Sequence, residues 1–150
     1  MYLLSTHTVL FLLSIQVKPR VWMHPVKGLK VLLVDDDEEQ LRSFRSILER
    51  NGATVGTSIT GMEAVKMARM GEYDVSIVDI KLPDIQGDEV VRRLKKIDDS
   101  MGFILVTGYP SLQDCIEVLD LGINDILLKP IEPEELLRAV AEAATVEVVA

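Results

Sequence analysis

Six polar groups with the chemistry to bind a cation and a phosphate stand at the ends of short apolar runs. Three of them are carboxylates in sequence, Asp35–Asp37, and the others are Asp79, Thr107 and Lys129. Carboxylates held close together repel and raise one another's pKa unless a cation lies among them. Oxygen ligands with room for water suit Mg²⁺, which takes one or two carboxylates and leaves positions for phosphate oxygens. The pattern therefore predicts a magnesium site.

Asp79 is a candidate nucleophile, because a carboxylate can accept a phosphoryl group as an acyl phosphate. The metal ion, the Lys129 ammonium and the Thr107 hydroxyl would neutralise and hold the phosphoryl oxygens, which is most of what phosphoryl transfer asks of a protein. Each group alone has a simpler explanation, such as a helix cap for an aspartate after a strand. Their equivalent positions in the chain favour a single site.

The elements that must position these groups are five short β-branched or apolar runs that alternate with segments of helical spacing. The runs predict strands at residues Val31–Val34, Thr54–Thr57, Val75–Val78, Phe103–Val106 and Ile126–Leu128. Continuous apolar strands are typical of parallel sheets covered on both faces, and the alternation with helices predicts an α/β, doubly wound (βα)5 domain. The carboxyl ends of parallel strands share one edge, where ligands bind.

Apolar residues at helical spacing indicate which faces of the intervening helices are buried. The expected buried positions are Leu41, Phe44 and Leu48, then Val90, Val91 and Leu94, then Cys115, Ile116 and Leu119, and finally Leu136, Leu137 and Val140. Thr60 and Glu63 have the spacing of a capping box at the start of the second helix. Asp37, with two glutamates after it, is expected at the amino end of the first helix, where the dipole favours negative charge.

Composition restricts the class of protein. The 150 residues are 48% apolar and 27% charged, as in an ordinary globular domain. Cys115 is the single cysteine, so no intrachain disulfide can form, and a reducing, cytoplasmic location is expected. Both histidines, His7 and His24, precede the regular pattern, which leaves the remainder without histidine for zinc or acid–base chemistry.

Charge is unevenly distributed. The net charge is −8, yet no acid precedes Asp35, and four basic residues there contribute +4, which leaves −12 for the rest of the chain. An acidic body argues against direct nucleic-acid binding, because phosphate contacts need clustered Lys and Arg.

The first 28 residues differ in pattern from the rest of the chain. Residues 1–17 are uncharged and largely apolar, and a basic stretch comes after them. A secretory signal would carry its charge before the apolar run, and the run is at the short limit for a membrane span and contains polar residues. Residues 1–28 are therefore expected outside the core fold, as an extension upstream of Met23. A membrane or partner anchor and an extra packed element are the alternatives. The domain itself is expected over residues 29–146.

Between about Leu29 and Ala144 the chain resembles the receiver domain of two-component response regulators. The matching segments are "VLLVDDD", "VSIVDIKLPDIQG", "ILVTG" and "DILLKP", which agree with that family in order, approximate spacing and strand placement. The resemblance implies a flavodoxin-like fold with strand order 2-1-3-4-5. It also implies a phosphoprotein that carries an aspartyl phosphate in a phosphorelay.

The resemblance assigns roles to the acidic residues. Asp79 would be phosphorylated by a histidine kinase or a histidine phosphotransfer protein. Asp36, Asp79 and the backbone carbonyl of Lys81 would bind Mg²⁺ directly, and Asp35 would assist through water. The protein would be a phosphoacceptor rather than an enzyme, with self-catalysed phosphotransfer and autodephosphorylation as its own chemistry.

Further roles are implied by the same resemblance. Lys129 would contact the phosphoryl group, and Thr107 would move toward it and reshape the face made by the fourth helix, the fifth strand and the fifth helix. Pro83 and Gly87 match the loop after the phosphoacceptor, and Pro130 matches a proline whose peptide bond is usually cis.

One position departs from the family. The fifth strand usually carries Tyr or Phe three residues before the lysine, and here that residue is Ile126. Tyr109 is a candidate substitute ring, with an ordinary loop aromatic as the alternative.

The expected partners are a kinase or phosphotransfer protein, and either a downstream protein target or an output domain in a longer regulator. A homodimer through the fourth helix, fifth strand and fifth helix is a further option.

Three rival functions fit parts of the pattern. A haloacid-dehalogenase-like phosphatase would use Asp35 and Asp37 as its Asp-x-Asp pair, but Glu38 and Glu39 stand where that pattern has Thr or Val, and Asp79 is left unexplained. A Rossmann nucleotide binder needs a Gly-rich turn after the first strand, which is absent. A pseudo-receiver that binds partners without phosphorylation is the third alternative.

Overall fold

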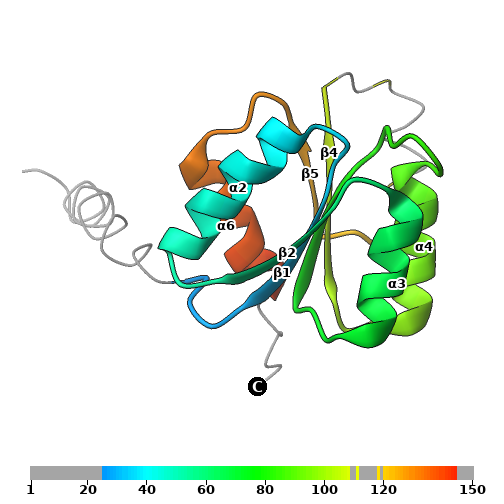
Figure 1. Ribbon diagram of the computed structural model, residues 1–150, viewed down its shortest axis with the longest axis horizontal. Helices are drawn as coiled ribbons and strands as arrows, with labels where there is room; N and C mark the ends of the chain where they lie inside the picture. Colours follow the sequence, from blue (N-terminus) through cyan, green and yellow to red (C-terminus); the bar gives the residue numbers. More distant parts are fainter. Residues whose placement is uncertain (1–24, 109–110, 112–117, 119, 145–150) are drawn as a thin grey trace, which may run out of the picture.

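Parallel strands alternate with helices along the chain in the computed structural model, which describes residues 25–108, 111, 118 and 120–144. Figure 1 shows the sheet between two pairs of helices. The elements are β1 (Lys30–Val34), α2 (Glu38–Arg50), β2 (Thr54–Ser58), α3 (Gly61–Met70), β3 (Val75–Asp79), α4 (Gly87–Ile97), β4 (Gly102–Thr107), β5 (Asp125–Leu128) and α6 (Pro133–Ala144).

All five strands are parallel and stand in the order β2-β1-β3-β4-β5. This order confirms the predicted fold class. Because the chain passes from β1 to β2 on one side and then crosses to β3 on the other, the strand order reverses between β1 and β3. In open α/β sheets, ligands bind at such a switch point, beyond the carboxyl ends of the strands.

Two separate apolar clusters cover the two faces of the sheet. Helices α2 and α6 lie on one face, and α3 and α4 lie on the other (Figure 1). In β1, Leu33 belongs to the first cluster and Leu32 to the second, since successive side chains of a strand point to opposite faces. Both are at most 1% exposed, so both faces of the central strand are buried, as its continuous apolar sequence predicted.

The predicted helix faces are buried where the structure describes them. Leu41, Phe44 and Leu48 face the sheet from α2, and Val90, Val91 and Leu94 do so from α4. In α6, Leu136 and Val140 are buried and Leu137 is half-buried. The predicted fourth helix, with Cys115, Ile116 and Leu119, lies outside the described residues, as does Tyr109.

Side-chain caps begin two of the helices. Asp37 accepts hydrogen bonds from the backbone N–H groups of Glu39 (3.0 Å) and Gln40 (3.3 Å), as expected for the start of α2. At α3, Thr60 Oγ1 accepts from the N–H of Glu63 at 3.2 Å. The N–H of Thr60 donates to Ser58 Oγ at 3.3 Å, so the reciprocal half of the predicted capping box is made by a serine of β2 rather than by Glu63.

The packed chain begins before Leu29. Val26, in the segment predicted to lie outside the core, is fully buried in the cluster under α2 and α6. Its carbonyl accepts from the N–H of Leu29 (3.1 Å), and the N–H of Gly28 donates to the carbonyl of Gly52 (2.9 Å). Among the helices of the described residues, none is long and apolar enough to cross a membrane.

Candidate functional site

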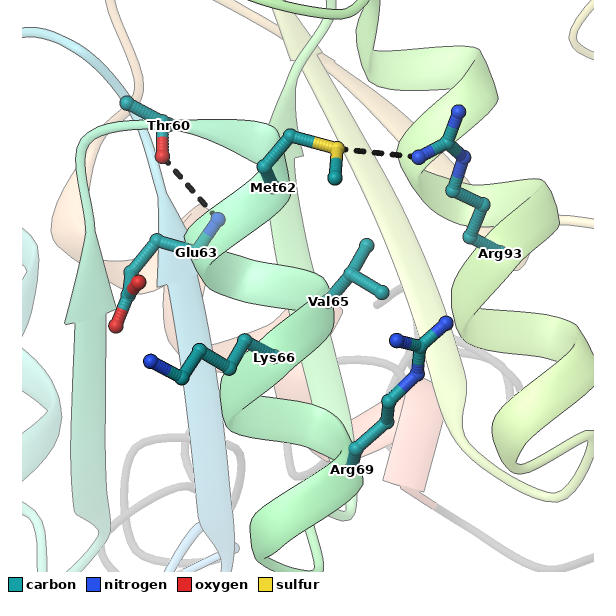
Figure 2. Close-up of a pocket in the computed structure, with 7 residues that line it drawn as sticks. All are labelled: Thr60, Met62, Glu63, Val65, Lys66, Arg69 and Arg93. Carbon is teal, nitrogen blue, oxygen red and sulfur yellow. Dashed lines mark hydrogen bonds between the residues drawn. The ribbon is translucent and has the colours of Figure 1, made fainter.

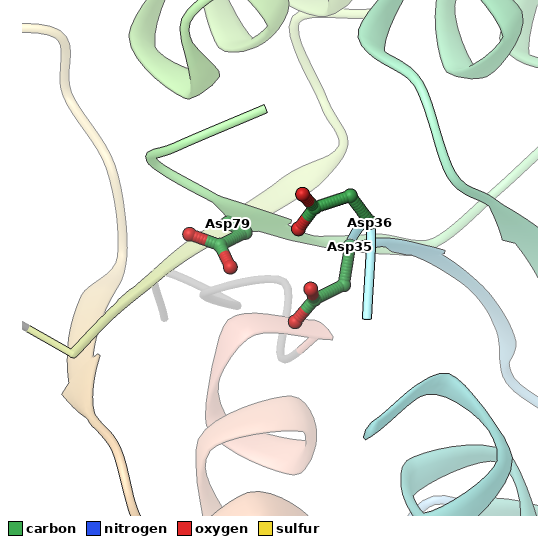
Figure 3. Close-up of side chains that lie close together, drawn as sticks. All are labelled: Asp35, Asp36 and Asp79. Atoms are coloured by element: carbon green, nitrogen blue, oxygen red, sulfur yellow. The ribbon is translucent and has the colours of Figure 1, made fainter. Parts of the chain in front are cut away.

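Three carboxylates meet at the switch point. Asp35 and Asp36 follow β1, and Asp79 ends β3, which is paired with β1. One oxygen from each lies within 4.8 Å of the others, and Figure 3 shows the three side chains grouped there. Asp35 and Asp79 are 5% and 8% exposed, whereas Asp36 is exposed. The cluster therefore has two buried members and one at the solvent side.

Backbone groups orient both buried carboxylates. The N–H of Asp37 donates to Asp35 Oδ1 (2.9 Å), and the N–H of Lys81 donates to Asp79 Oδ1 (3.0 Å). In both cases the donor lies two residues after the aspartate, where the chain turns away from the strand. This geometry is an Asx turn, in which a carboxylate accepts from the backbone two residues on. One oxygen of each carboxylate is thereby fixed.

Lys129 joins the two other oxygens. Its Nζ lies 3.0 Å from Asp35 Oδ2 and 2.8 Å from Asp79 Oδ2. The lysine directly follows β5. Its backbone N–H donates a hydrogen bond to the carbonyl of Thr107 at 2.9 Å, which fixes the backbone of Lys129 to β4. The peptide bond between Lys129 and Pro130 is cis, as the resemblance implied. A residue that follows β5 thus reaches across the sheet edge to the ends of β1 and β3.

Burial and charge act against each other in this cluster. Burial raises the pKa of Asp35, and the Asp37 N–H and the Lys129 ammonium offset only part of this effect, so the pKa of that carboxyl stays above its usual range. Burial lowers the pKa of Lys129, but the hydrogen bonds and charges of Asp79 and Asp35 outweigh it and raise the pKa. Three carboxylates face one ammonium, which leaves the site with an excess of negative charge.

The donor set fits a magnesium ion. Mg²⁺ takes oxygen ligands at about 2.1 Å in octahedral geometry, which places ligand oxygens roughly 3–4 Å apart. One carboxylate oxygen from each of Asp35, Asp36 and Asp79 lies within 4.8 Å of the other two, which is close to the spacing of oxygens around one ion. The exposed Asp36 would give such an ion access from solvent. The part predicted for the Lys81 carbonyl stays a prediction.

The other predicted residues surround the cluster. Thr107 is 3% exposed and ends β4, the neighbour of β3. Ile126 in β5 is half-buried and packs against the cluster under α3 and α4. The roles predicted for both residues stay predictions.

Gly87 closes the loop that carries Pro83. Its N–H donates to the carbonyl of Ile80 at 2.7 Å. A Cβ at this position would lie 2.7 Å from Ile80 Cα and even closer to the Asp79 carbonyl oxygen. The backbone of Asp79 and Ile80 leaves no room for a side chain at position 87, which explains on steric grounds why this position of the motif is a glycine. Pro83 itself is exposed, beside the buried Leu82.

Asp84 is a residue of this loop that the sequence reasoning missed. Its two carboxylate oxygens each accept a hydrogen bond of 2.8 Å, from the N–H groups of Gly61 and Met62 at the start of α3. Burial raises the pKa of Asp84, and the backbone N–H groups of Met62, Gly61, Ile85 and Asp84 itself together lower it by more, so the pKa of this carboxyl lies below its usual range. In sequence, an aspartate after a proline is typical of a turn; only the adjacency of the two loops in the fold discloses a helix cap.

Comparisons with known proteins agree with this arrangement. The family of the response regulator receiver domain matches residues 31–141. The uncharacterised transcriptional regulatory protein YkoG of Bacillus subtilis is 38% identical over 113 residues, which are 75% of this chain and 50% of YkoG. The chain thus spans about half the length of that relative.

Solved structures give the same result. A CheY-like receiver domain protein from Methanospirillum hungatei is 34% identical with a TM-score of 0.75, and the match covers 77% of this chain and 93% of that one. A response regulator from Burkholderia pseudomallei, solved with a phosphorylated aspartic acid, a calcium ion and citrate, is 26% identical with a TM-score of 0.71, over 75% and 66% of the two chains. This chain belongs to the response regulator receiver domain family.

Proposed function

We propose that the chain is a phosphorylation-activated receiver domain of a two-component system, in which Asp79 accepts a phosphoryl group from a histidine kinase or a histidine phosphotransfer protein. The observation that carries this proposal is the cluster itself: two buried carboxylates share one ammonium, and a third carboxylate lies at the solvent side. The phosphorylated aspartic acid in the related Burkholderia pseudomallei structure supports it.

In the proposed reaction, an oxygen of Asp79 attacks the phosphorus of a phosphohistidine. A phosphorus–oxygen bond forms, the phosphorus–nitrogen bond breaks, and the imidazole nitrogen keeps the electron pair. A bound Mg²⁺, held directly by Asp36, Asp79 and the Lys81 carbonyl and through water by Asp35, would supply positive charge to the phosphoryl oxygens.

Lys129 would move from its bridge between Asp35 and Asp79 to a phosphoryl oxygen, because the phosphorylated Asp79 Oδ no longer carries its own charge. The Thr107 hydroxyl, at the end of the adjacent strand, would donate to another phosphoryl oxygen. Movement of these two residues would change the surface of β5 and α6 and of the segment before β5, and so present a different face to a target protein. That face is also where a homodimer would form.

The location and partners belong to the same proposal. We infer a cytoplasmic receiver that acts on a downstream protein or on an output domain of a longer regulator. The match to half of YkoG, which is named a transcriptional regulatory protein, supports the second arrangement. Residues 29–146 would form the receiver, with Val26 of the preceding segment packed against its core.

The test is phosphorylation by a small-molecule phosphodonor in the presence of Mg²⁺, followed by intact-mass and peptide mass spectrometry. One phosphoryl group is expected on Asp79 in the native chain and none in Asp79→Asn. Asp99→Asn, which changes an exposed aspartate away from the cluster, is the matched control and should be labelled normally.

Two other results would favour the rival functions. Labelling that persists in Asp79→Asn but vanishes in Asp35→Asn would favour the phosphatase with Asp35 as its nucleophile. A native chain that binds neither the phosphodonor nor beryllofluoride in Mg²⁺ would favour the pseudo-receiver.

A further inference from the structure

A groove lies between α3 and α4, on the sheet face opposite α2 and α6. It is an open depression of about 420 Å³, lined by Thr60, Met62, Glu63, Val65, Lys66, Arg69 and Arg93. Figure 2 shows Met62, Val65 and Arg69 along α3, with Arg93 reaching toward them from α4. The Arg93 guanidinium lies 3.1 Å from the Met62 sulfur. Apolar surface and positive charge are therefore combined in one groove.

Three basic residues line this groove, Lys66, Arg69 and Arg93, and two of them have no carboxylate partner among the described residues. No carboxylate of the described ranges lies within 4.0 Å of the charged groups of Lys66 or Arg69. Both side chains are exposed. Arg93 uses its Nε for Glu89 at 3.2 Å, which leaves the outer end of its guanidinium directed to Met62. Glu63 also lines the groove, so its three cations stand against Glu63 and the Arg93-bound Glu89, which leaves a small positive excess in a chain with a net charge of −8.

Large apolar side chains are exposed on the same helix. Among the described residues, four are strongly exposed: Ile59 (48%), Met62 (50%), Met70 (81%) and Leu128 (51%). Three of these four lie on α3 or directly before it. Methionine adapts its shape to different partners and is common at binding surfaces, and exposed apolar groups beside charged ones mark interaction sites.

The start of α3 is also fixed in position. Both oxygens of Asp84 hold the N–H groups of Gly61 and Met62, and a Cβ on Gly61 would lie 2.6 Å from side-chain atoms of Ile85 and Val90. The backbone that presents Met62 is therefore tied to two neighbouring segments. A surface held in this way loses little conformational freedom when a partner binds.

We propose that the α3–α4 groove binds a short acidic segment of a partner protein, with a carboxylate between Arg69 and Arg93 and an apolar side chain against Met62 and Val65. Arginine binds carboxylates through paired hydrogen bonds, so this pairing suits the groove. A nucleic acid fits less well, because its phosphate backbone extends beyond three cations. The acidic remainder of the chain would repel the other phosphates.

The test uses a phage-displayed library of random peptides, selected on the full chain. The enriched peptides should carry Asp or Glu beside Leu, Phe or Met. Fluorescence anisotropy with the selected peptide should show roughly tenfold weaker binding to Arg69→Glu, because the change replaces an attraction by a repulsion. Met62→Gln should also weaken binding, through the apolar contact. Unfolding curves of each variant establish that it is folded.

Arg42→Glu is the matched control, because it makes the same charge change on an exposed arginine of α2, on the other face of the sheet. It should bind the peptide like the native chain. The peptide should also perturb amide NMR signals of α3 and α4 in both the native chain and Asp79→Asn. Binding that survives in Asp79→Asn separates this surface from the phosphorylation proposed above.

Several results would overturn the proposal. These are a library that yields no peptide sensitive to Arg69→Glu, selected peptides without acidic residues, equal weakening by Arg42→Glu, and NMR changes centred on α2 and α6. Self-association in sedimentation that is lost in Arg69→Glu would assign the groove to a second copy of the chain instead.

Discussion

Replacing Gly87 by alanine tests whether backbone crowding sets the position of the loop after Asp79. The added Cβ would lie 2.7 Å from Ile80 Cα and closer still to the Asp79 carbonyl oxygen, whereas an ordinary contact begins at 3.4 Å, so one segment must move by at least about 0.7 Å. The same movement stretches the hydrogen bond from the Gly87 N–H to the Ile80 carbonyl, which is 2.7 Å long. Because both obstructing groups are backbone, rotation of a side chain cannot relieve the contact.

The expected cost has three parts. Overpacking costs about 1–3 kcal/mol, and a weakened hydrogen bond costs up to about 1 kcal/mol. Alanine has a higher helix propensity than glycine, which offsets this cost by up to about 1 kcal/mol. We therefore expect Gly87→Ala to lower the free energy of unfolding by roughly 1–3 kcal/mol, and to slow phosphorylation of Asp79, whose own carbonyl is displaced.

Urea unfolding followed by circular dichroism measures the stability change. Gly108→Ala is the matched control, since a Cβ at Gly108 meets no atom within 4 Å, and its stability should stay within about 0.5 kcal/mol of the native value or rise slightly. If Gly87→Ala unfolds at the same urea concentration as Gly108→Ala, backbone crowding is not what selects glycine in this loop.

Three further predictions concern charges. The raised pKa of Asp35 means that its ionised form costs stability above that pKa, and the cost disappears as the pH falls below the ordinary value of 3.8. Asp35→Asn should therefore be more stable than the native chain at neutral pH, with a difference that closes in acid; a constant difference would contradict this. Lys129→Met should lose roughly 1–3 kcal/mol at neutral pH, less than for a fully buried pair because the lysine side chain is 24% exposed, and Mg²⁺ should restore more stability to this variant than to the native chain in thermal unfolding. The lowered pKa of Asp84 means that its contribution is present at neutral pH and is lost as the pH falls through that pKa. Asp84→Ala should cost about 1 kcal/mol at neutral pH, as a lost helix cap does, and equal losses at neutral and acidic pH in urea unfolding would refute the cap.

Much of the architecture follows from local patterns. The central strands β1, β3 and β4 were predictable because they are largely continuous apolar runs, as burial of both faces of a parallel sheet requires, and β2 was recognised by its β-branched residues instead. Asp37 was separable from the two aspartates before it because a residue at a helix start meets free N–H groups, whatever the tertiary structure. These features depend on a few neighbouring residues.

The remaining features depend on contacts between distant loops. The bridge from Lys129 to Asp35 joins residues 94 positions apart, and the cap from Asp84 to Gly61 joins residues 23 apart. The sequence predicts that such groups reach the same edge of the sheet, but which oxygen meets which donor is decided by side-chain geometry. Asp35 and Asp36 are an example, because they are adjacent in the chain and yet Asp35 is buried whereas Asp36 is exposed.

The position of Lys129 has a consequence for local opening of the domain. It is attached to β5, a strand of four residues that pairs with β4 at the end of the described sheet and has Leu127 as its buried member. Short, exposed strands open without global unfolding, and their amides exchange with solvent through that opening. The two ion pairs of Lys129 tie this strand to the ends of β1 and β3. Hydrogen exchange in β5 should therefore report which partner holds Lys129, and any ligand that draws the ammonium away from Asp35 should change the exchange rate of a strand that it does not touch.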